Sequence, residues 1–200
     1  SCFRRLSHLI EWSLDFIYSV AISSYSHWLV TGSGDNTARL WDLTAPDPAC
    51  APIVFLGHEV LILVAAICSD VHWLVTGAGS NIVSTGFGQI KLGEDFTARL
   101  WDLTYPGSAI ADTSVILRGH EGSIRAAAIS ADNTLVTTSD DSMIRLWKLP
   151  NASAAPVVLR GHQGAGINAV AVSPNGNWLA TGGDDSTVRL WPLAAPDPAV

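Results

Sequence analysis

The chain has 200 residues, of which 48% are apolar and 14% charged, and this composition suits a folded domain with a hydrophobic core. Its formal net charge is −7 and its eleven basic residues are scattered, so we expect no nucleic-acid partner, because phosphate binding relies on clustered Lys and Arg. The longest apolar run, residues 60–68, is too short to cross a bilayer, so we expect no membrane partner either.

The cysteines and the N-terminus indicate a cellular compartment. Cys2, Cys50 and Cys68 have no paired spacing, so the sequence predicts neither a disulfide framework nor a zinc site. Near the N-terminus, Glu11 and Asp15 interrupt what would be the apolar centre of a signal peptide. These features favour a reducing compartment, and we expect a cytoplasmic protein.

One phrase recurs along the chain. It reads "VTGSGDNTARLWDL" at 30–43, and much of it returns at 94–103, 137–149 and 181–193. A Gly-His pair precedes the second, third and fourth copies, at 57–58, 119–120 and 161–162. Self-similarity at this period indicates a repeat architecture, and we divide the chain into repeats of about 1–49, 50–110, 111–154 and 155–200.

Each repeat is predicted to contain four short strands. In the third, "IRAAAIS" (124–130), "TLVTT" (134–138) and "MIRLW" (143–147) are separated by the turn sequences "ADN" and "SDDS", and "PVVLRGH" (156–162) follows. Asn175-Gly176 marks a tight hairpin in the fourth repeat. Nothing predicts helices between these strands. We therefore expect four-stranded antiparallel sheets in series that bury their faces against one another.

Taken together, the Gly-His pair, the Thr-Gly or Thr-Thr strand end, the Asp in a tight turn and the strand ending in Trp-Asp resemble the WD40-repeat β-propeller family over about residues 15–193. The near-identity of some units, such as "TARLWDLT" at 37–44 and 97–104, resembles repeats of large bacterial multidomain signalling proteins. The resemblance implies an all-β fold of about four blades. Closed propellers of the family usually have seven or eight, so we expect an open arc or part of a larger ring, with exposed blade faces that favour self-association.

The resemblance also implies a hydrogen-bonded network within each blade. Its members here would be His58, Thr76, Asp95 and Trp101; His120, Thr137, Asp141 and Trp147; His162, Thr181, Asp185 and Trp191; and, in the first repeat, Thr31, Asp35 and Trp41, with Trp12 or Glu11 near the place of the missing Gly-His. The residue types fit this role, because a buried carboxylate needs donors, an imidazole and a hydroxyl can supply them, and an indole N–H only donates.

The same residue types could form a hydrolytic triad, but they recur in every unit and no GxSxG sequence accompanies them, so we expect no catalytic site. The Asp pairs at 140–141 and 184–185 could suggest a metal or acid–base site. The second Asp of each pair holds the network position, and no metal-ligand spacing accompanies them, so we expect no metal or other cofactor.

The second repeat contains an insertion at about 79–93, because nineteen residues separate Thr76 from Asp95 where the other repeats have four. Two apolar stretches flank "STGFG", which predicts a protruding hairpin. Gly86-Phe87-Gly88 does not lie between a strand and a helix, so it is not interpreted as a phosphate loop.

These observations predict a non-catalytic protein–protein interaction scaffold. An alternative is the regulatory or sensory region of a larger signalling enzyme whose NTPase, kinase or protease-like module lies outside this chain. The candidate partner-binding residues lie after the Gly-His pairs, in the turns and in the insertion: Glu59, Glu121, Gln163, Asn36, Asp140, Asp184 and Phe87.

Overall fold

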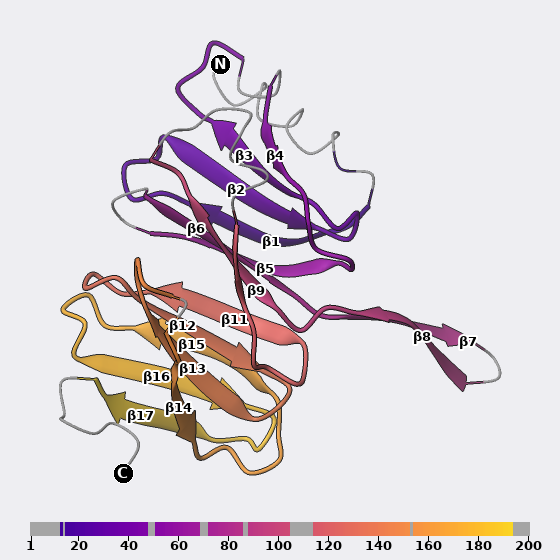
Figure 1. The fold of residues 1–200 in the computed structure, drawn as a ribbon, viewed down its shortest axis with the longest axis vertical. Helices are drawn as coiled ribbons and strands as arrows, with labels where there is room; N and C mark the ends of the chain where they lie inside the picture. The colour runs from indigo at the N-terminus through magenta and orange to yellow at the C-terminus, as the bar shows by residue number, and fades with distance from the viewer. Residues whose placement is uncertain are drawn as a thin grey trace.

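The computed structural model describes residues 13, 15–47, 51–68, 72–85, 88–104, 114–152 and 154–193. In these residues the chain forms three four-stranded antiparallel sheets, one three-stranded sheet and a separate two-stranded hairpin (Figure 1). The described residues form no helix that could cross a membrane. The prediction of an incomplete propeller built of antiparallel sheets is confirmed.

The sheets follow one another along the chain. Sheet 1 contains β1 (Ile17–Ile22), β2 (Trp28–Ser33), β3 (Ala38–Asp42) and β4 (Ile53–Phe55). Sheet 2 contains β5 (Ile62–Ile67), β6 (Trp73–Ala78), β9 (Ala98–Asp102) and β10 (Val115–Leu117). Sheet 3 contains β11 (Ile124–Ile129), β12 (Thr134–Ser139), β13 (Met143–Lys148) and β14 (Val157–Arg160). Sheet 4 contains β15 (Ile167–Val172), β16 (Trp178–Gly183) and β17 (Val188–Pro192).

The sheets are offset from the sequence repeats. The outer strand β4 completes sheet 1 although residues 53–55 belong to the second repeat, and β10 and β14 complete sheets 2 and 3 in the same way. The second, third and fourth repeats therefore each begin with a strand that completes the preceding sheet.

Both faces of sheet 3 are buried because it lies between two other sheets. In the register of β12 and β13, Leu135 is opposite Trp147 and Val136 is opposite Leu146. Since successive side chains of a strand point to opposite faces, the first pair packs towards sheet 2 and the second towards sheet 4. This explains why the middle strands contain adjacent apolar residues instead of a strict apolar–polar alternation.

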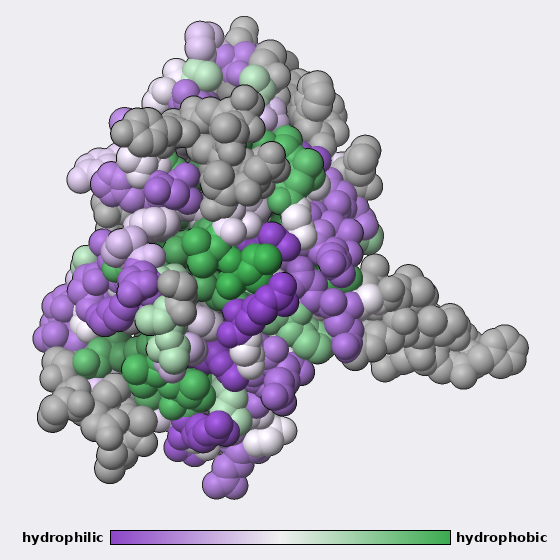
Figure 2. All heavy atoms as spheres, viewed as in Figure 1, coloured by the Kyte–Doolittle hydropathy of each residue, from purple (hydrophilic) through white to green (hydrophobic). Residues whose placement is uncertain are grey.

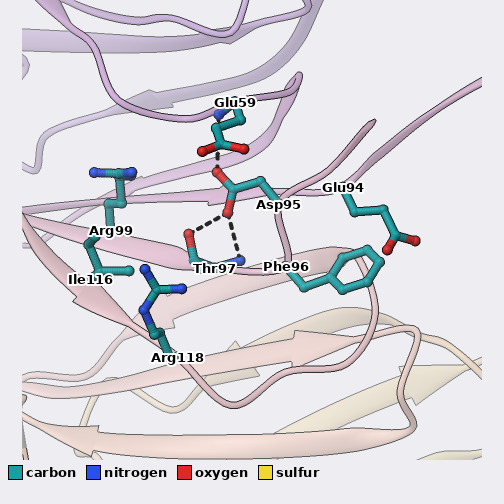
Figure 3. Close-up of a pocket in the computed structure, with 8 residues that line it drawn as sticks. All are labelled: Glu59, Glu94, Asp95, Phe96, Thr97, Arg99, Ile116 and Arg118. Carbon is teal, nitrogen blue, oxygen red and sulfur yellow. Dashed lines mark hydrogen bonds between the residues drawn. The ribbon is translucent and has the colours of Figure 1, made fainter. Parts of the chain in front are cut away.

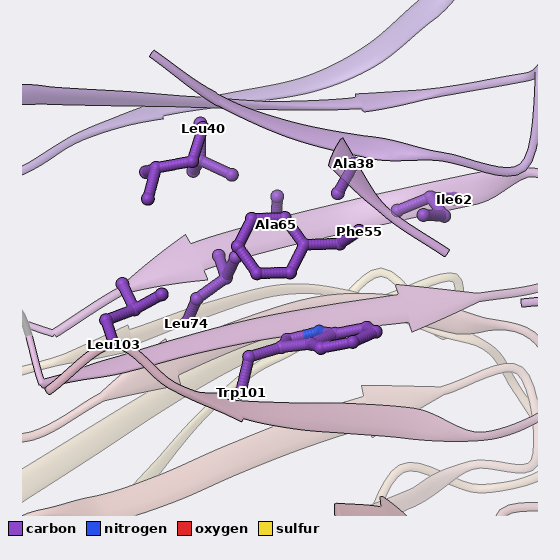
Figure 4. Close-up of a cluster of buried hydrophobic side chains, with 9 residues drawn as sticks. Ala38, Leu40, Phe55, Ile62, Ala65, Leu74, Trp101 and Leu103 are labelled. Carbon is purple, nitrogen blue, oxygen red and sulfur yellow. The ribbon is translucent and has the colours of Figure 1, made fainter. Parts of the chain in front are cut away.

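The hydrophobic core consists of three clusters, one between each pair of neighbouring sheets. Figure 4 shows the cluster between sheets 1 and 2, where the Phe55 and Trp101 rings meet edge to face with their centroids 5.0 Å apart. Leu40 and Leu74 complete this cluster from β3 and β6. The fold is therefore held together mainly by packing between sheets.

The insertion forms the antiparallel hairpin β7 (Ser80–Thr85) and β8 (Gly88–Glu94), which leaves sheet 2 between β6 and β9. It projects from the body of the molecule (Figure 1). At its base, Ser80 Oγ lies 3.4 Å from Ser123 Oγ of sheet 3. Phe87 lies outside the described residues.

Candidate interaction face

The network residues of sheet 2 are joined by hydrogen bonds. Nδ1 of His58 lies 2.7 Å from Oδ2 of Asp95, and Nε2 lies 2.8 Å from Thr76 Oγ1. Trp101 Nε1 donates to the same Thr76 hydroxyl at 3.0 Å. The network thus links the loop before β5 to the middle strand β6 and to β9.

Sheets 3 and 4 repeat this arrangement. His120 contacts Asp141 at 2.8 Å and Thr137 at 2.9 Å, and Trp147 donates to Thr137 at 3.0 Å. The corresponding distances in sheet 4 are 2.9 Å from His162 to Asp185, 2.9 Å from His162 to Thr181 and 3.0 Å from Trp191 to Thr181. The structure therefore brings together every residue of these two predicted sets.

Sheet 1 contains part of the network. Trp41 Nε1 donates to Thr31 Oγ1 at 3.2 Å, as in the other sheets. Where a His would approach the Asp, the Ser13 hydroxyl lies 3.3 Å from Asp35 Oδ2. Glu11 and Trp12, the residues considered for this place from the sequence, lie outside the described residues.

The protonation states follow from burial and hydrogen bonding. Burial would raise the pKa of Asp141, but hydrogen bonds from His120 and from backbone amides hold that pKa well below its usual range. Burial lowers the pKa of His120. The neutral imidazole can then donate from Nδ1 to the ionised Asp141 and accept the Thr137 hydroxyl proton at Nε2. In sheet 4, the hydrogen bond from His162 lowers the pKa of Asp185 to about 2.

Each network Asp also shapes its own turn. One carboxylate oxygen accepts the backbone N–H two residues further on, at 3.0 Å for Asp35, 3.1 Å for Asp95, 2.9 Å for Asp141 and 3.0 Å for Asp185. Asx turns of this kind explain why Asp occurs at these positions. The intervening residue has a positive φ at Asn36, Ser142 and Ser186.

The arginines two residues before each Trp have a role that sequence reasoning missed. Arg39 and Arg145 pair with the network Asp of their own sheets, at 3.0 and 2.9 Å. Arg99 and Arg145 also donate to the carbonyl oxygens of Gly57 and Gly119, at 2.7 and 2.6 Å. The regular Asp-to-Arg spacing of four residues was the signal that could have revealed this role.

The predicted contact residues other than Phe87, which lies outside the described residues, share one face of the sheets, which we call the network face. It is formed by the loops that carry the network His residues and the turns that carry the network Asp residues. Glu59, Glu121 and Gln163 are exposed, while the backbone N–H groups of Glu59 and Glu121 donate to Asp95 and Asp141 at 3.3 and 3.0 Å. The network therefore fixes the backbone of these loops and leaves their side chains in solvent.

The turn residues are held by neighbours. Asn36 Nδ2 donates to the backbone oxygen of Glu59, across the boundary between sheets 1 and 2, at 3.3 Å. Asp140 accepts two hydrogen bonds from Arg125, at 2.7 and 2.8 Å, and Asp184 accepts one from Asn168. These carboxylates are half-buried or exposed, so they stay accessible on the network face.

A β-bulge in the first strand of each sheet adds a second row of side chains to the network face. The register of every first strand shifts at one residue, and these bulge residues are Tyr18, Leu63, Arg125 and Asn168. Each faces the residue three positions after the network Thr of its sheet, which is Gly34, Gly79, Asp140 or Asp184. Bulges often re-aim a side chain next to a functional site. The sequence signal was an Ile followed by a variable residue in every unit.

The polarity of the bulge residue and of the residue that it faces changes from sheet to sheet. An ideal Cβ at Gly79 would lie 2.5 Å from Leu63 Cδ1, and one at Gly34 would lie 3.2 Å from Tyr18 Cε2, so a bulky residue faces a glycine in sheets 1 and 2. In sheets 3 and 4, Arg125 and Asn168 face carboxylates instead. The pairs of sheets 3 and 4 are therefore charged or polar, sheet 2 pairs Leu63 with a glycine, and sheet 1 places both Tyr18 and the Asp15 carboxylate beside Gly34.

Repeated sheets of this kind, each with a His–Asp–Thr–Trp network, define the WD40 class of β-propeller proteins. The family model for the WD domain, G-beta repeat, matches residues 3–42, 112–148 and 156–192, and the chain belongs to this family. The matched ranges leave out the whole of the second repeat, which carries the hairpin.

Several proteins are similar in sequence. Telomerase protein component 1 of Rattus norvegicus is 37% identical over 157 residues, which cover 78% of this chain and 5% of that protein. Protein tipD of Dictyostelium discoideum is 26% identical over 133 residues, covering 66% of this chain and 18% of tipD. Apoptotic protease-activating factor 1 of Homo sapiens is 35% identical over 91 residues, covering 41% of this chain and 7% of that protein. The chain thus spans a small part of each relative.

Proposed function

We propose that the chain is a non-catalytic scaffold that binds a partner protein through its network face. The WD40 repeat is a protein-interaction domain type, and the chain contains matches to it in three places. The observation that carries the proposal is the rigid backbone beneath variable side chains. Asp95 and Asp141 hold the loops of Glu59 and Glu121, whose side chains are exposed. The bulge residues of the same face vary from sheet to sheet, as Tyr18, Leu63, Arg125 and Asn168.

The placement of the network residues supports the non-catalytic part of the proposal. The Thr76 and Thr137 hydroxyls are buried and each accepts a hydrogen bond from a tryptophan, so neither is placed to attack a substrate. A nucleophile needs access to substrate as well as a base. These groups therefore serve the fold.

A matched pair of tyrosines allows a test. Tyr18 and Tyr25 are both exposed, and Tyr18 lies on the network face while Tyr25 lies in the turn at the far end of β1. We expect Tyr18→Ser and Glu121→Lys to lose partners that the unmodified chain retains in quantitative affinity capture. Tyr25→Ser should retain them. Identical partner sets for all three variants would contradict binding through this face.

A second proposal concerns the wider protein. The relatives are far longer than the stretch they share with this chain, which covers 5% of telomerase protein component 1 and 7% of apoptotic protease-activating factor 1. This favours a propeller region that serves a larger multidomain protein. Sequencing the full transcript tests the idea, and an open reading frame with no further domain would contradict it.

The exposed face of sheet 4 supports self-association. Val188 and Leu190 are 76% and 67% exposed, whereas Ile144 and Leu146, which hold the same positions in sheet 3, are 0% and 9% exposed. Figure 2 shows hydrophobic residues gathered over the C-terminal part of the molecule. We propose that a second copy of the chain covers this face of sheet 4, because the corresponding faces of sheets 1, 2 and 3 are each buried by the next sheet.

A further inference from the structure

A pocket of about 170 Å³ opens at the outer edge of sheet 2, beside the base of the β7–β8 hairpin (Figure 3). Its lining comes from the loop before β5, the β8–β9 connection, β9, β10 and the residue after it. The lining residues are Glu59, Glu94, Asp95, Phe96, Thr97, Arg99, Ile116 and Arg118. Asp95 belongs to the network of sheet 2, and its other carboxylate oxygen accepts the Thr97 hydroxyl.

Comparison with sheet 3 shows why the pocket is open. The strand register places Thr97 where sheet 3 has Met143, and Arg118 where sheet 3 has Arg160. In sheet 3, Arg160 lies against Met143, with 3.2 Å between the guanidinium nitrogen and Sδ. In sheet 2 the shorter Thr97 turns its hydroxyl to Asp95 at 2.5 Å. The volume that Met143 fills in sheet 3 therefore stays empty in sheet 2.

Arg99 also differs from Arg39 and Arg145. Arg39 and Arg145 pair with the network Asp of their sheets, but Arg99 donates to Ser114 Oγ at 3.1 Å and to the Gly57 oxygen at 2.7 Å. Its guanidinium is thereby drawn towards β10. A second arginine, Arg118, is exposed and makes no hydrogen bond or ion pair with another described residue.

The pocket has two charged sides. Figure 3 shows Arg99 and Arg118 on one side and Glu94 and Phe96 on the other, with Glu59 at a third edge. Ile116 adds apolar surface beside the two arginines, and Phe96 adds apolar surface beside Glu94. A ligand that carries charge of a single sign would be repelled by one of the two sides. A ligand that carries a positive and a negative group would be complementary to both sides.

We propose that this pocket binds a peptide of a partner protein through one acidic side chain that is adjacent to a basic residue. The volume suits one side chain. Arg118 and Arg99 would hold the carboxylate by charge-assisted hydrogen bonds, and Glu59 would hold the basic neighbour. This inference rests on the proposed scaffold function and adds a second contact site, beside the hairpin, to the network face.

The test uses blocked dipeptides and amide NMR spectra of the isotope-labelled chain. We expect N-acetyl-Glu-Lys-amide to shift the amide signals of the lining residues in a saturable way. N-acetyl-Glu-Glu-amide and N-acetyl-Lys-Lys-amide should bind at least several-fold more weakly. Arg118→Gln should abolish the shifts, and the matched variant Arg160→Gln, which changes the equivalent residue of sheet 3, should preserve them.

Three results would overturn the proposal. They are an absence of shifts at the lining residues, equal binding of the Lys-Lys peptide, and unchanged binding by Arg118→Gln. Arg118 is exposed, so its replacement should leave the fold intact. The amide spectrum of the variant shows whether it does. If the dipeptides fail while Tyr18→Ser still loses its partners, the pocket proposal falls and the scaffold proposal stands.

Discussion

Gly77 and Ile124 interlock across the boundary between sheets 2 and 3. An ideal Cβ on Gly77 would lie 2.6 Å from Cγ2 of Ile124, closer than two carbon atoms can pack. Gly32 and Ile62 repeat the arrangement between sheets 1 and 2, at 2.8 Å. In sheet 3 the same position is Thr138, whose hydroxyl donates to the Ile167 oxygen at 2.9 Å.

Gly77→Ala should therefore destabilise the fold, because the added methyl group overpacks a boundary that has no free volume. We expect a loss of about 1–3 kcal/mol in the free energy of unfolding, measured by denaturant titration. Gly182→Ala is the matched control, since its nearest neighbour would be Ala169 Cβ at 3.9 Å. The control should be neutral or slightly stabilising, and equal losses in both variants would contradict this account.

Asp141→Ala should lower the melting temperature clearly. It removes the partner of His120, Arg145 and the Glu121 backbone amide, and unpaired buried groups typically cost about 2–4 kcal/mol. The matched change is Asp140→Ala, which breaks a partly exposed ion pair with Arg125 and should cost less than about 1 kcal/mol. A melt of Asp141→Ala within a degree of the unmodified chain would refute the structural role of the network.

The network should also make stability depend on pH in two steps. The pKa of His120 is lower in the folded chain than its ordinary value of 6.5, so the unfolded chain binds a proton first as the pH falls below 6.5. The free energy of unfolding should decrease in that range. The lowered pKa values of Asp95 and Asp141 should cause a second decrease below about pH 4, where the unfolded carboxyls bind protons first.

Thermal melts between pH 7.5 and 3 measure both steps. His120→Gln should be less stable at neutral pH and should show a smaller decrease between pH 7 and 5 than the unmodified chain. The decrease below pH 4 should remain, because Asp95 and Asp185 keep their histidine partners in that variant. A melting temperature that does not change between pH 7 and 5 would contradict the lowered pKa of His120.

Replacement of Val188 and Leu190 by serine should reduce self-association. Both side chains are largely exposed on sheet 4, so removing them takes away apolar surface without opening a cavity. Light scattering at increasing protein concentration provides the measurement, with Tyr25→Ser as a variant that removes an exposed apolar residue elsewhere. Unchanged association of the double variant would show that copies meet through another surface.

The fold could be predicted from the sequence because the Asp and Trp markers recur in all four sheets and the Gly-His marker in three of them. The network sets could be assigned for the same reason, since each marker belongs to one structural position. The bulge residues Tyr18 and Arg125 could not, because their direction depends on a one-residue shift of strand register. The pocket could not either, because it depends on how Arg118, which follows β10, lies relative to Thr97 across the pairing of β9 and β10.

The offset between repeats and sheets has a practical consequence for protein engineering. Between residues 115 and 120, the chain first forms the outer strand of sheet 2 and then supplies His120 to the network of sheet 3. Deleting one sequence repeat would therefore damage two sheets at once. A cassette meant for transplantation into another propeller should carry residues 119–160, and its recipient should provide an outer strand for the preceding sheet.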